Sequence, residues 1–318
     1  MEKWAWLEPA DGKEKNMIYL DHAATTPTAS EVRAAMEPYY QRRYGNASTP
    51  YEFGQHSREA VENARKIIAD TLGVQTSEIY FTSGGTESDN WALKATMEAY
   101  AFRGRHMITT QIEHHAIGNT CEYLRKRGFE VTELPVDRDG RISLEQLEHA
   151  IRQDTVLISI MCANNEIGTL QDMEAIGEIA RRRGVIFHTD AVQAYGQIPI
   201  DVNGWNVQML SASSHKFYGP KGCGFLYMKQ GLRTESMIHG GAQESGRRAG
   251  TENVPGIVGM AKAAQIAFYH MDETMERETW MRDRMIHHIC SEIPGAFLVG
   301  NQTHRLPGNL NICFPGIQ

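Results

Sequence analysis

The sequence lacks the features of a membrane protein, a disulfide-stabilised protein and a nucleic-acid-binding protein. No apolar run is long enough to span a bilayer, and the N-terminus has no apolar core of signal-peptide length. The 5 cysteines have no metal-ligand or redox spacing, and an odd number argues against a disulfide framework. A net charge of −7 disfavours binding to a polyanion. We therefore expect a cytoplasmic protein that binds no membrane, nucleic acid or metal.

The sequence also lacks the common nucleotide-binding motifs. The glycine pair in Thr82–Asn90 matches neither the GxGxxG pattern of dinucleotide-binding folds nor the Walker pattern of ATP-binding loops. This gives a dehydrogenase-like function little support.

Strand-like and helical patterns alternate from residue 58 onward. This alternation predicts an α/β fold with a mostly parallel seven-stranded sheet covered on both faces. The short link between the last two strands predicts one antiparallel neighbour. The expected strands are 79–82, 107–110, 130–134, 156–162, 185–189, 207–211 and 224–228, and the expected helices include 58–72, 117–127, 144–151 and 173–183.

The pattern changes after Gly256, which indicates a second domain. Two helices are expected at 257–267 and 271–289, followed by strand-like segments at 296–299 and 309–314. The predicted organisation is a tail, a large cofactor-binding domain whose first residues pack with the small domain, and an incomplete α+β small domain. Their ranges are 1–17, 18–256 and 257–318.

The most informative segment, Ser211 to Lys216, lies between an apolar strand and a glycine-rich turn. A lysine at the end of a strand can direct its amine into the cleft where open α/β sheets bind ligands. The neighbouring Ser213 and His215 can donate to a phosphate. An amine beside anion-binding groups suggests pyridoxal 5′-phosphate held as a Schiff base. The alternative is a surface lysine in a polar turn.

Two other strand ends carry groups suited to the same ligand. Gly85 and Thr86 begin a helix, whose free N–H groups could bind a phosphate; a glycine pair before a capped helix is also common. Asp190 ends an apolar strand and could pair with a protonated pyridine nitrogen, while Gln193 could donate to the phenolic oxygen of the ring. The alternative for Asp190 is a helix N-cap.

A histidine and an asparagine follow two further strands. His114 could stack on a flat ring and move protons near neutral pH, or be a surface histidine. An asparagine of the Asn164–Gly168 segment could bind a substrate carboxylate or the cofactor, or serve only as a turn residue.

In this order, these motifs resemble those of the NifS/IscS-type cysteine desulfurases, which are class V aminotransferase-type pyridoxal-phosphate enzymes of fold type I. The resemblance covers about Ile18 to Phe314. Its most specific stretches are Tyr19–Pro27, Thr82–Asn90, Asn164–Gly168, Asp190 with Gln193, Ser213–Lys216 and Arg247–Glu252.

The resemblance implies a role for each matching residue. Lys216 is the Schiff-base lysine, His114 the ring-stacking acid–base residue, and Asp190 the partner of the pyridine nitrogen. Gln193 lies at the phenolic oxygen, and Asn165 lies near substrate and cofactor. The implied phosphate-binding residues are Gly85, Thr86, Ser213 and His215, with Thr251 reaching the phosphate from the other subunit of a homodimer.

The implied activity is removal of sulfur from L-cysteine, giving L-alanine and an enzyme persulfide for iron–sulfur cluster or thionucleoside biosynthesis. The implied partner is an iron–sulfur scaffold or another sulfur-acceptor protein. The alternatives are a related lyase, such as a selenocysteine lyase or a β-eliminating lyase, and a non-catalytic cofactor-binding scaffold.

The sequence departs from the family pattern at its C-terminal end. The nucleophilic cysteine and the substrate-binding arginine of the family follow the strand that here reads Asn309 to Phe314, so the chain is expected to be truncated before them. Cys162, Cys223 and Cys313 are expected to be small core or turn residues, with Cys313 buried. The segment Gly45–Tyr51 also differs from the usual family pattern.

Overall fold

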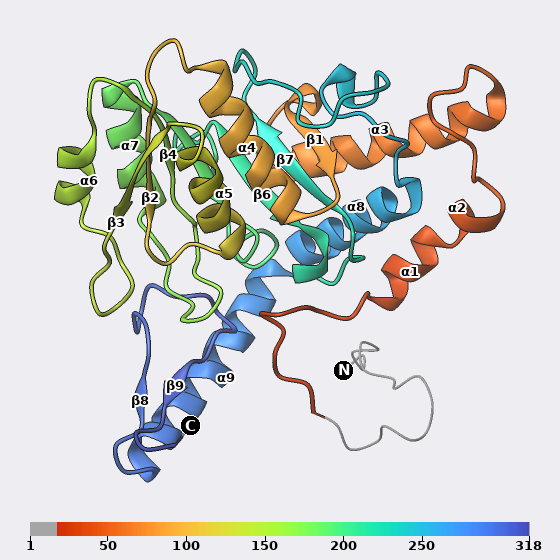
Figure 1. Cartoon of the computed structure of the whole chain (residues 1–318). Coiled ribbons are helices and arrows are strands. Elements are labelled where there is room, and N and C mark those ends of the chain that lie inside the picture. The colour runs from red at the N-terminus through yellow and green to blue at the C-terminus, as the bar shows by residue number, and fades with distance from the viewer. Residues whose placement is uncertain (1–17, 318) are drawn as a thin grey trace.

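A seven-stranded sheet forms the centre of the molecule (Figure 1). The computed structural model describes residues 18–317, so the expected tail at 1–17 lies outside the described residues. The strands lie in the order β1-β7-β6-β5-β4-β2-β3. Their bounds are β1 Ile79–Thr82, β2 His106–Thr110, β3 Glu130–Leu134, β4 Thr155–Ser159, β5 Ile186–Asp190, β6 Met209–Ser213 and β7 Gly224–Met228.

The sheet is mostly parallel, as the sequence predicts. Strand β7 is antiparallel to β6, and it is also antiparallel to β1 on its other side. Two reversals bring β1 back to the direction of β6, so both strands end at the same edge of the sheet. The structure corrects the position of β6, which begins at Met209 rather than at residue 207 and extends to Ser213.

Apolar side chains cover both faces of the sheet. Met107 and Leu157 belong to one buried cluster, whereas their chain neighbours Ile108 and Ile158 belong to another. Successive side chains on a strand point to opposite faces, so continuous apolar runs of this kind specify a sheet that is buried on both sides.

Helices form the outer layers. Helices α4 and α5 pack together on one face, and α1, α3 and α8 pack together on the other (Figure 1). The helix bounds are α1 Ser30–Met36, α2 Pro38–Gln41, α3 Glu52–Leu72, α4 Gly85–Ala99, α5 His115–Arg125, α6 Leu144–Ala150, α7 Met173–Arg183, α8 Val254–Tyr269 and α9 Met271–Glu292.

Local sequence explains the ends of α7, which matches its predicted range. The Asp172 side chain accepts the N–H of Ala175 at the start, and Gly184 adopts a left-handed conformation (φ 65°) at the end. Helix α3 likewise ends before the left-handed Gly73, but it begins at Glu52, earlier than predicted. No helix within residues 18–317 is both long and apolar enough to cross a membrane.

The C-terminal part extends away from the sheet. Helix α8 packs on α3 and α1, whereas α9 projects beyond them and contacts a short hairpin of β8 (Phe297–Leu298) and β9 (Ile312–Cys313) (Figure 1). The boundary expected after residue 256 falls inside α8, and the division into two domains remains a prediction. Contrary to expectation, Cys313 is half-buried rather than buried, because the two-stranded hairpin covers little of it.

A buried ion pair fixes the long segment between β7 and α8. Arg65 of α3 donates from both terminal nitrogens to the Glu244 carboxylate, at 2.7 and 2.9 Å. The same carboxylate accepts the backbone N–H of Phe81 at 2.9 Å, and Arg65 also donates to the carbonyl of Ile79. Glu244 therefore connects this segment to α3 and β1 at once.

We expect Glu244→Gln to lower the free energy of unfolding by about 3 kcal/mol, because it leaves the Arg65 guanidinium without its buried counter-ion. Urea denaturation measures this loss. The matched control is Lys66→Ala, which removes the exposed Lys66–Asp70 pair and should cost less than about 1 kcal/mol. Equal losses in the two variants would contradict the anchoring role of Glu244.

Candidate active site

A cavity of about 1440 Å³ lies at the edge where the parallel strands end. Segments following β1, β2, β4, β5 and β6 line it, together with residues 19–29 and part of α9. This is the edge at which open α/β sheets bind ligands. The topology therefore brings together residues that are far apart in the sequence.

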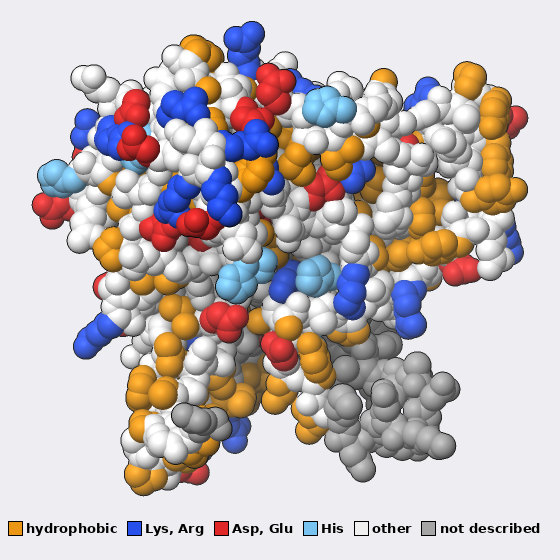
Figure 2. All heavy atoms as spheres, in the orientation of Figure 1, with side chains coloured by type: hydrophobic (Ala, Val, Ile, Leu, Met, Phe, Trp, Pro, Cys, Tyr) orange, Lys and Arg blue, Asp and Glu red, His pale blue; other side chains and the backbone are white. Residues whose placement is uncertain are grey.

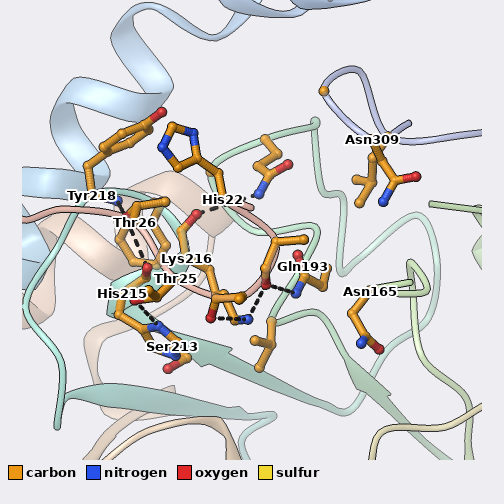
Figure 3. A pocket seen from close by; sticks show the side chains of 18 of the residues that line it. His22, Thr25, Thr26, Asn165, Gln193, Ser213, His215, Lys216, Tyr218 and Asn309 are labelled. Atoms are coloured by element: carbon orange, nitrogen blue, oxygen red, sulfur yellow. Dashed lines mark hydrogen bonds between the residues drawn. The ribbon is translucent and has the colours of Figure 1, made fainter. Parts of the chain in front are cut away.

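Most of the predicted site residues line this one cavity, and several of their side chains converge in Figure 3. Thr251 is exposed and does not line the cavity of its own chain. The predicted residues that do line it are Gly85, Thr86, His114, Asn165, Asp190, Gln193, Ser213, His215 and Lys216.

Lys216 lies on a 3₁₀ turn directly after β6. Its Nζ donates to the carbonyl of Ala24 at 2.9 Å and to that of Ala23 (Figure 3). Burial lowers the pKa of this amine, while the carboxylates of Asp190, Asp21 and Glu166 oppose the shift. A lowered pKa increases the fraction of neutral amine, which is the form that attacks a carbonyl carbon.

Residues 23–29 form one wall of the cavity, a role that the sequence did not reveal. Ala23 also accepts a hydrogen bond from the Gln193 side chain at 2.9 Å. Thr26 donates its N–H to the carbonyl of His215, and its hydroxyl accepts the N–H of Tyr218. These contacts bind the segment to the lysine turn. They are mostly backbone contacts, which residue type does not signal.

Asp190 is a buried carboxyl group, 5% exposed, at the end of β5. It accepts the backbone N–H of Val192 at 2.8 Å in a turn, so the expected alternative of a helix N-cap does not apply. Burial raises the pKa of Asp190, whereas the Val192 N–H, His114 and Lys216 oppose the shift. A cationic ring nitrogen would stabilise the ionised form of this carboxyl group.

The N-terminus of α4 can bind an anion. Its N-cap, Gly84, provides no side-chain cap. A Cβ on residue 85 would approach the Val192 side chain to 2.5 Å. Glycine at this position therefore allows the first turn of α4 to lie close to the turn that follows β5. Ser213 lies beside Gly84.

His215 shares a hydrogen bond with Thr25. Burial and the nearby lysines lower the pKa of His215 to about 4, so its ring is neutral at neutral pH.

His114 and Asn165 line the same cavity. The ring Nδ1 of His114 accepts the N–H of Ala116 and thereby caps α5, which leaves Nε2 for other contacts. The amide of Asn165 donates to Glu166 at 2.8 Å. The structure places both residues at the cavity without assigning either a chemical role.

These groups fit pyridoxal 5′-phosphate. A helix N-terminus without a side-chain cap suits the phosphate, and the buried carboxyl group of Asp190 suits the ring nitrogen. The Lys216 amine, with its lowered pKa, suits the aldehyde. Fold and site together define a pyridoxal-phosphate enzyme.

Comparisons with known proteins agree. A family model described as aminotransferase class-V matches residues 18–318. The cysteine desulfurase IscS of Methanosarcina thermophila is 52% identical over 305 residues, which cover 96% of this chain and 75% of that protein. The cysteine desulfurase IscS of Dictyoglomus turgidum is 48% identical over 304 residues, which cover 96% of this chain and 77% of that protein.

Solved structures give the same result. A NifS-like protein superposes with a TM-score of 0.92 at 41% identity, covering 94% of this chain and 82% of its own. SspA in complex with cysteine superposes with a TM-score of 0.77 at 43% identity, covering 78% and 72%. The chain therefore belongs to the class V aminotransferase family, among its pyridoxal-phosphate-dependent cysteine desulfurases.

Glu113, beside the site, is a half-buried residue with a buried carboxyl group that the sequence did not single out. Its Oε1 accepts the Thr110 hydroxyl at 2.7 Å and the Met161 N–H at 3.0 Å. Its Oε2 is buried and has no hydrogen-bond partner among the described residues. Burial raises the pKa of Glu113 to about 8, and Asp190 adds to the shift.

This shift predicts a pH dependence of stability. Between about pH 5 and about pH 8, folded Glu113 keeps a proton that the unfolded chain has lost, so stability falls as pH rises. Glu113→Gln removes this contribution and should reduce the fall by up to about 1.4 kcal/mol per pH unit. Urea unfolding at both ends of the range measures it. Exposed Glu98→Gln is the control, and identical pH slopes for Glu113→Gln and the unchanged protein would refute the interpretation.

Proposed function

We propose that this protein removes sulfur from L-cysteine to give L-alanine, with pyridoxal 5′-phosphate held by the residues that line the cavity. The convergence of Lys216, Asp190 and Gln193 on one cavity carries the proposal. Two relatives at 52% and 48% identity are cysteine desulfurases, and one similar structure is described as a complex with cysteine.

Each residue has a role that follows from its position. Lys216 provides the amine that holds the aldehyde, and Asp190 stabilises a proton on the ring nitrogen. Gly85, Thr86, Ser213 and His215 hold the phosphate. When bound, the cofactor supplies an electron sink for bonds to the carbon atoms of the amino acid.

His114, Gln193 and Asn165 act around the ring and the substrate. Because Nδ1 accepts the Ala116 N–H, the neutral His114 ring carries its proton on Nε2, and this N–H donates towards the cofactor and substrate. The Gln193 amide donates to the phenolic oxygen, and Asn165 orients the amino-acid substrate. Residues 23–29 limit the access of water to Lys216.

Sulfur removal also needs a thiolate to accept the sulfur atom, and we assign this role to none of the 5 cysteines of this sequence. Cys121, Cys162 and Cys223 are buried, and burial raises the pKa of each thiol to about 12. Such thiols stay protonated and unreactive. Cys290 and Cys313 are half-buried and do not line the cavity.

The test uses protein expressed from the complete coding sequence and supplied with pyridoxal 5′-phosphate. Incubation with L-cysteine should yield equal amounts of sulfide and alanine in the presence of a thiol reductant. Lys216→Ala should abolish both the visible absorbance of the bound cofactor and product formation. The exposed Lys229→Ala, which lies outside the cavity, is the matched control.

Other outcomes would overturn the proposal. Pyruvate in place of alanine would indicate a β-eliminating lyase, and turnover of selenocysteine alone would indicate a selenocysteine lyase. A visible chromophore without any product would indicate a cofactor-binding scaffold.

We further propose a homodimer in which Thr251 completes the phosphate site of the partner subunit. Thr251 lies outside the cavity of its own chain. Large aromatic side chains are exposed around α2 and the start of α3, where hydrophobic surface is visible at the right of Figure 2. Exposed apolar patches of this kind favour association. These residues are Tyr40, Tyr44, Tyr51 and Phe53, which are 57%, 67%, 60% and 37% exposed.

Subunit complementation tests this arrangement. Lys216→Ala dimers should form no chromophore, and Thr251→Ala dimers should bind the cofactor more weakly than the unchanged protein. Mixed dimers of the two variants should regain one site of normal affinity, because the Lys216→Ala subunit supplies an intact Thr251. Absorbance titration of co-expressed, separately tagged subunits measures this, and mixed dimers without any restored site would refute the trans contact.

The sulfur acceptor we propose is an iron–sulfur scaffold or another acceptor protein, with both proteins in the cytoplasm. All 5 cysteines lie outside disulfides, which is typical of a reducing compartment.

A further inference from the structure

A second buried carboxyl group, Asp89 of α4, lies at the cavity beside Asp190. Asp89 is 1% exposed, and its Oδ1 has no hydrogen-bond partner among the described residues. The nearest ionisable nitrogen is Nε2 of His188, at 3.7 Å from this oxygen. An ionised carboxylate in such a place would be costly without a cation or several donors.

His188 is not the cation that Asp89 would need. Its Nδ1 pairs with the Ser159 hydroxyl at 2.9 Å, and its Nε2 pairs with the Ser211 hydroxyl at 3.0 Å. Burial lowers the pKa of His188 to about 3, so the ring is neutral at physiological pH. A neutral imidazole does not compensate a buried anion.

The other groups facing Asp89 favour its protonated form. Burial raises the pKa of Asp89, the negative charge of Asp190 raises it further, and a hydrogen bond with Ser211 opposes the shift; Glu113 adds to the rise only above about pH 8, where it ionises. Asp190 has the opposite surroundings. It accepts the Val192 N–H, and it faces Lys216 and His114 on the cavity side.

We propose that Asp89 carries a proton while Asp190 carries the negative charge. Asp89 is then a positioning residue: because it is neutral, Asp190 is the one carboxylate that faces the proton on the ring nitrogen. The assignment of the proton follows from this chain alone. The consequence for the ring nitrogen rests on the proposed cofactor function. Two ionised carboxylates buried side by side at the cavity would repel each other, so the stable arrangement has one negative charge, held by Asp190.

Infrared spectroscopy of the cofactor-free protein near neutral pH tests the assignment. Asp89→Asn should remove a C=O band of a protonated carboxyl group, and Asp190→Asn should remove a carboxylate band. Glu113→Gln identifies the second protonated carboxyl group, so the two bands are not confused. In Asp190→Asn, the Asp89 band should disappear at a lower pH than in the unchanged protein, because the neighbouring anion is gone.

The reverse pattern would overturn the proposal: loss of the protonated band in Asp190→Asn and loss of a carboxylate band in Asp89→Asn. Circular dichroism of each variant excludes misfolding as the cause, and Asp89→Glu, which keeps the carboxyl group, should retain a protonated band.

A second readout uses the cofactor. Asp190→Asn should weaken pyridoxal-phosphate binding by at least about tenfold, and Asp89→Asn should weaken it less, because a neutral amide there replaces a neutral acid. An equal or larger loss for Asp89→Asn would overturn the proposal. If the unchanged protein binds no pyridoxal phosphate, the proposed function fails, while the infrared result still decides which carboxyl group holds the proton.

Discussion

The central constraint on the active site is that an amine, Lys216, and a carboxyl group, Asp190, are both removed from water at the same edge of the sheet. Desolvation of each group has a free-energy cost. Burial alone would neutralise both Lys216 and Asp190. Each opposes the shift in pKa that burial imposes on the other: Asp190 works against the lowering of the Lys216 pKa, and Lys216 works against the raising of the Asp190 pKa. The glycine-led start of α4, the turn after β5 and the wall of residues 23–29 are arranged around this pair.

The wall of residues 23–29 shows how backbone groups complete a site that side chains begin. The carbonyl of Ala23 accepts hydrogen bonds from both Lys216 and Gln193. Two residues from different strand ends therefore share one acceptor on a segment that lies 170 and 193 positions earlier in the chain. Neutral carbonyl groups hold the lysine in place. The charged groups that affect the pKa of Lys216 are therefore Asp190 and the nearby carboxylates of Asp21 and Glu166.

Much of this arrangement could be predicted from the sequence, because strand ends and helix starts are local signals. The apolar runs gave the seven strands, and strand ends carrying Lys216, Asp190 and His114 pointed to one edge of a parallel sheet. Strand β6 was placed two residues early, since Val207 is as apolar as a strand residue but lies in the irregular segment between the preceding turn and the strand. Asp89 was missed because its burial arises from tertiary packing. Its position on the inward stripe of α4, four residues after Gly85, was the available signal.

The placement of β7 between β1 and β6 has a consequence for how the protein is made. Within residues 18–317, β1 pairs in the sheet with β7 alone, and β7 ends at Met228. A ribosome must therefore extrude most of the chain before the first strand finds its neighbour, which leaves an unpaired strand edge exposed on the nascent polypeptide. Contacts of such long sequence separation also slow folding, so the loop after β1 acquires its final surroundings late.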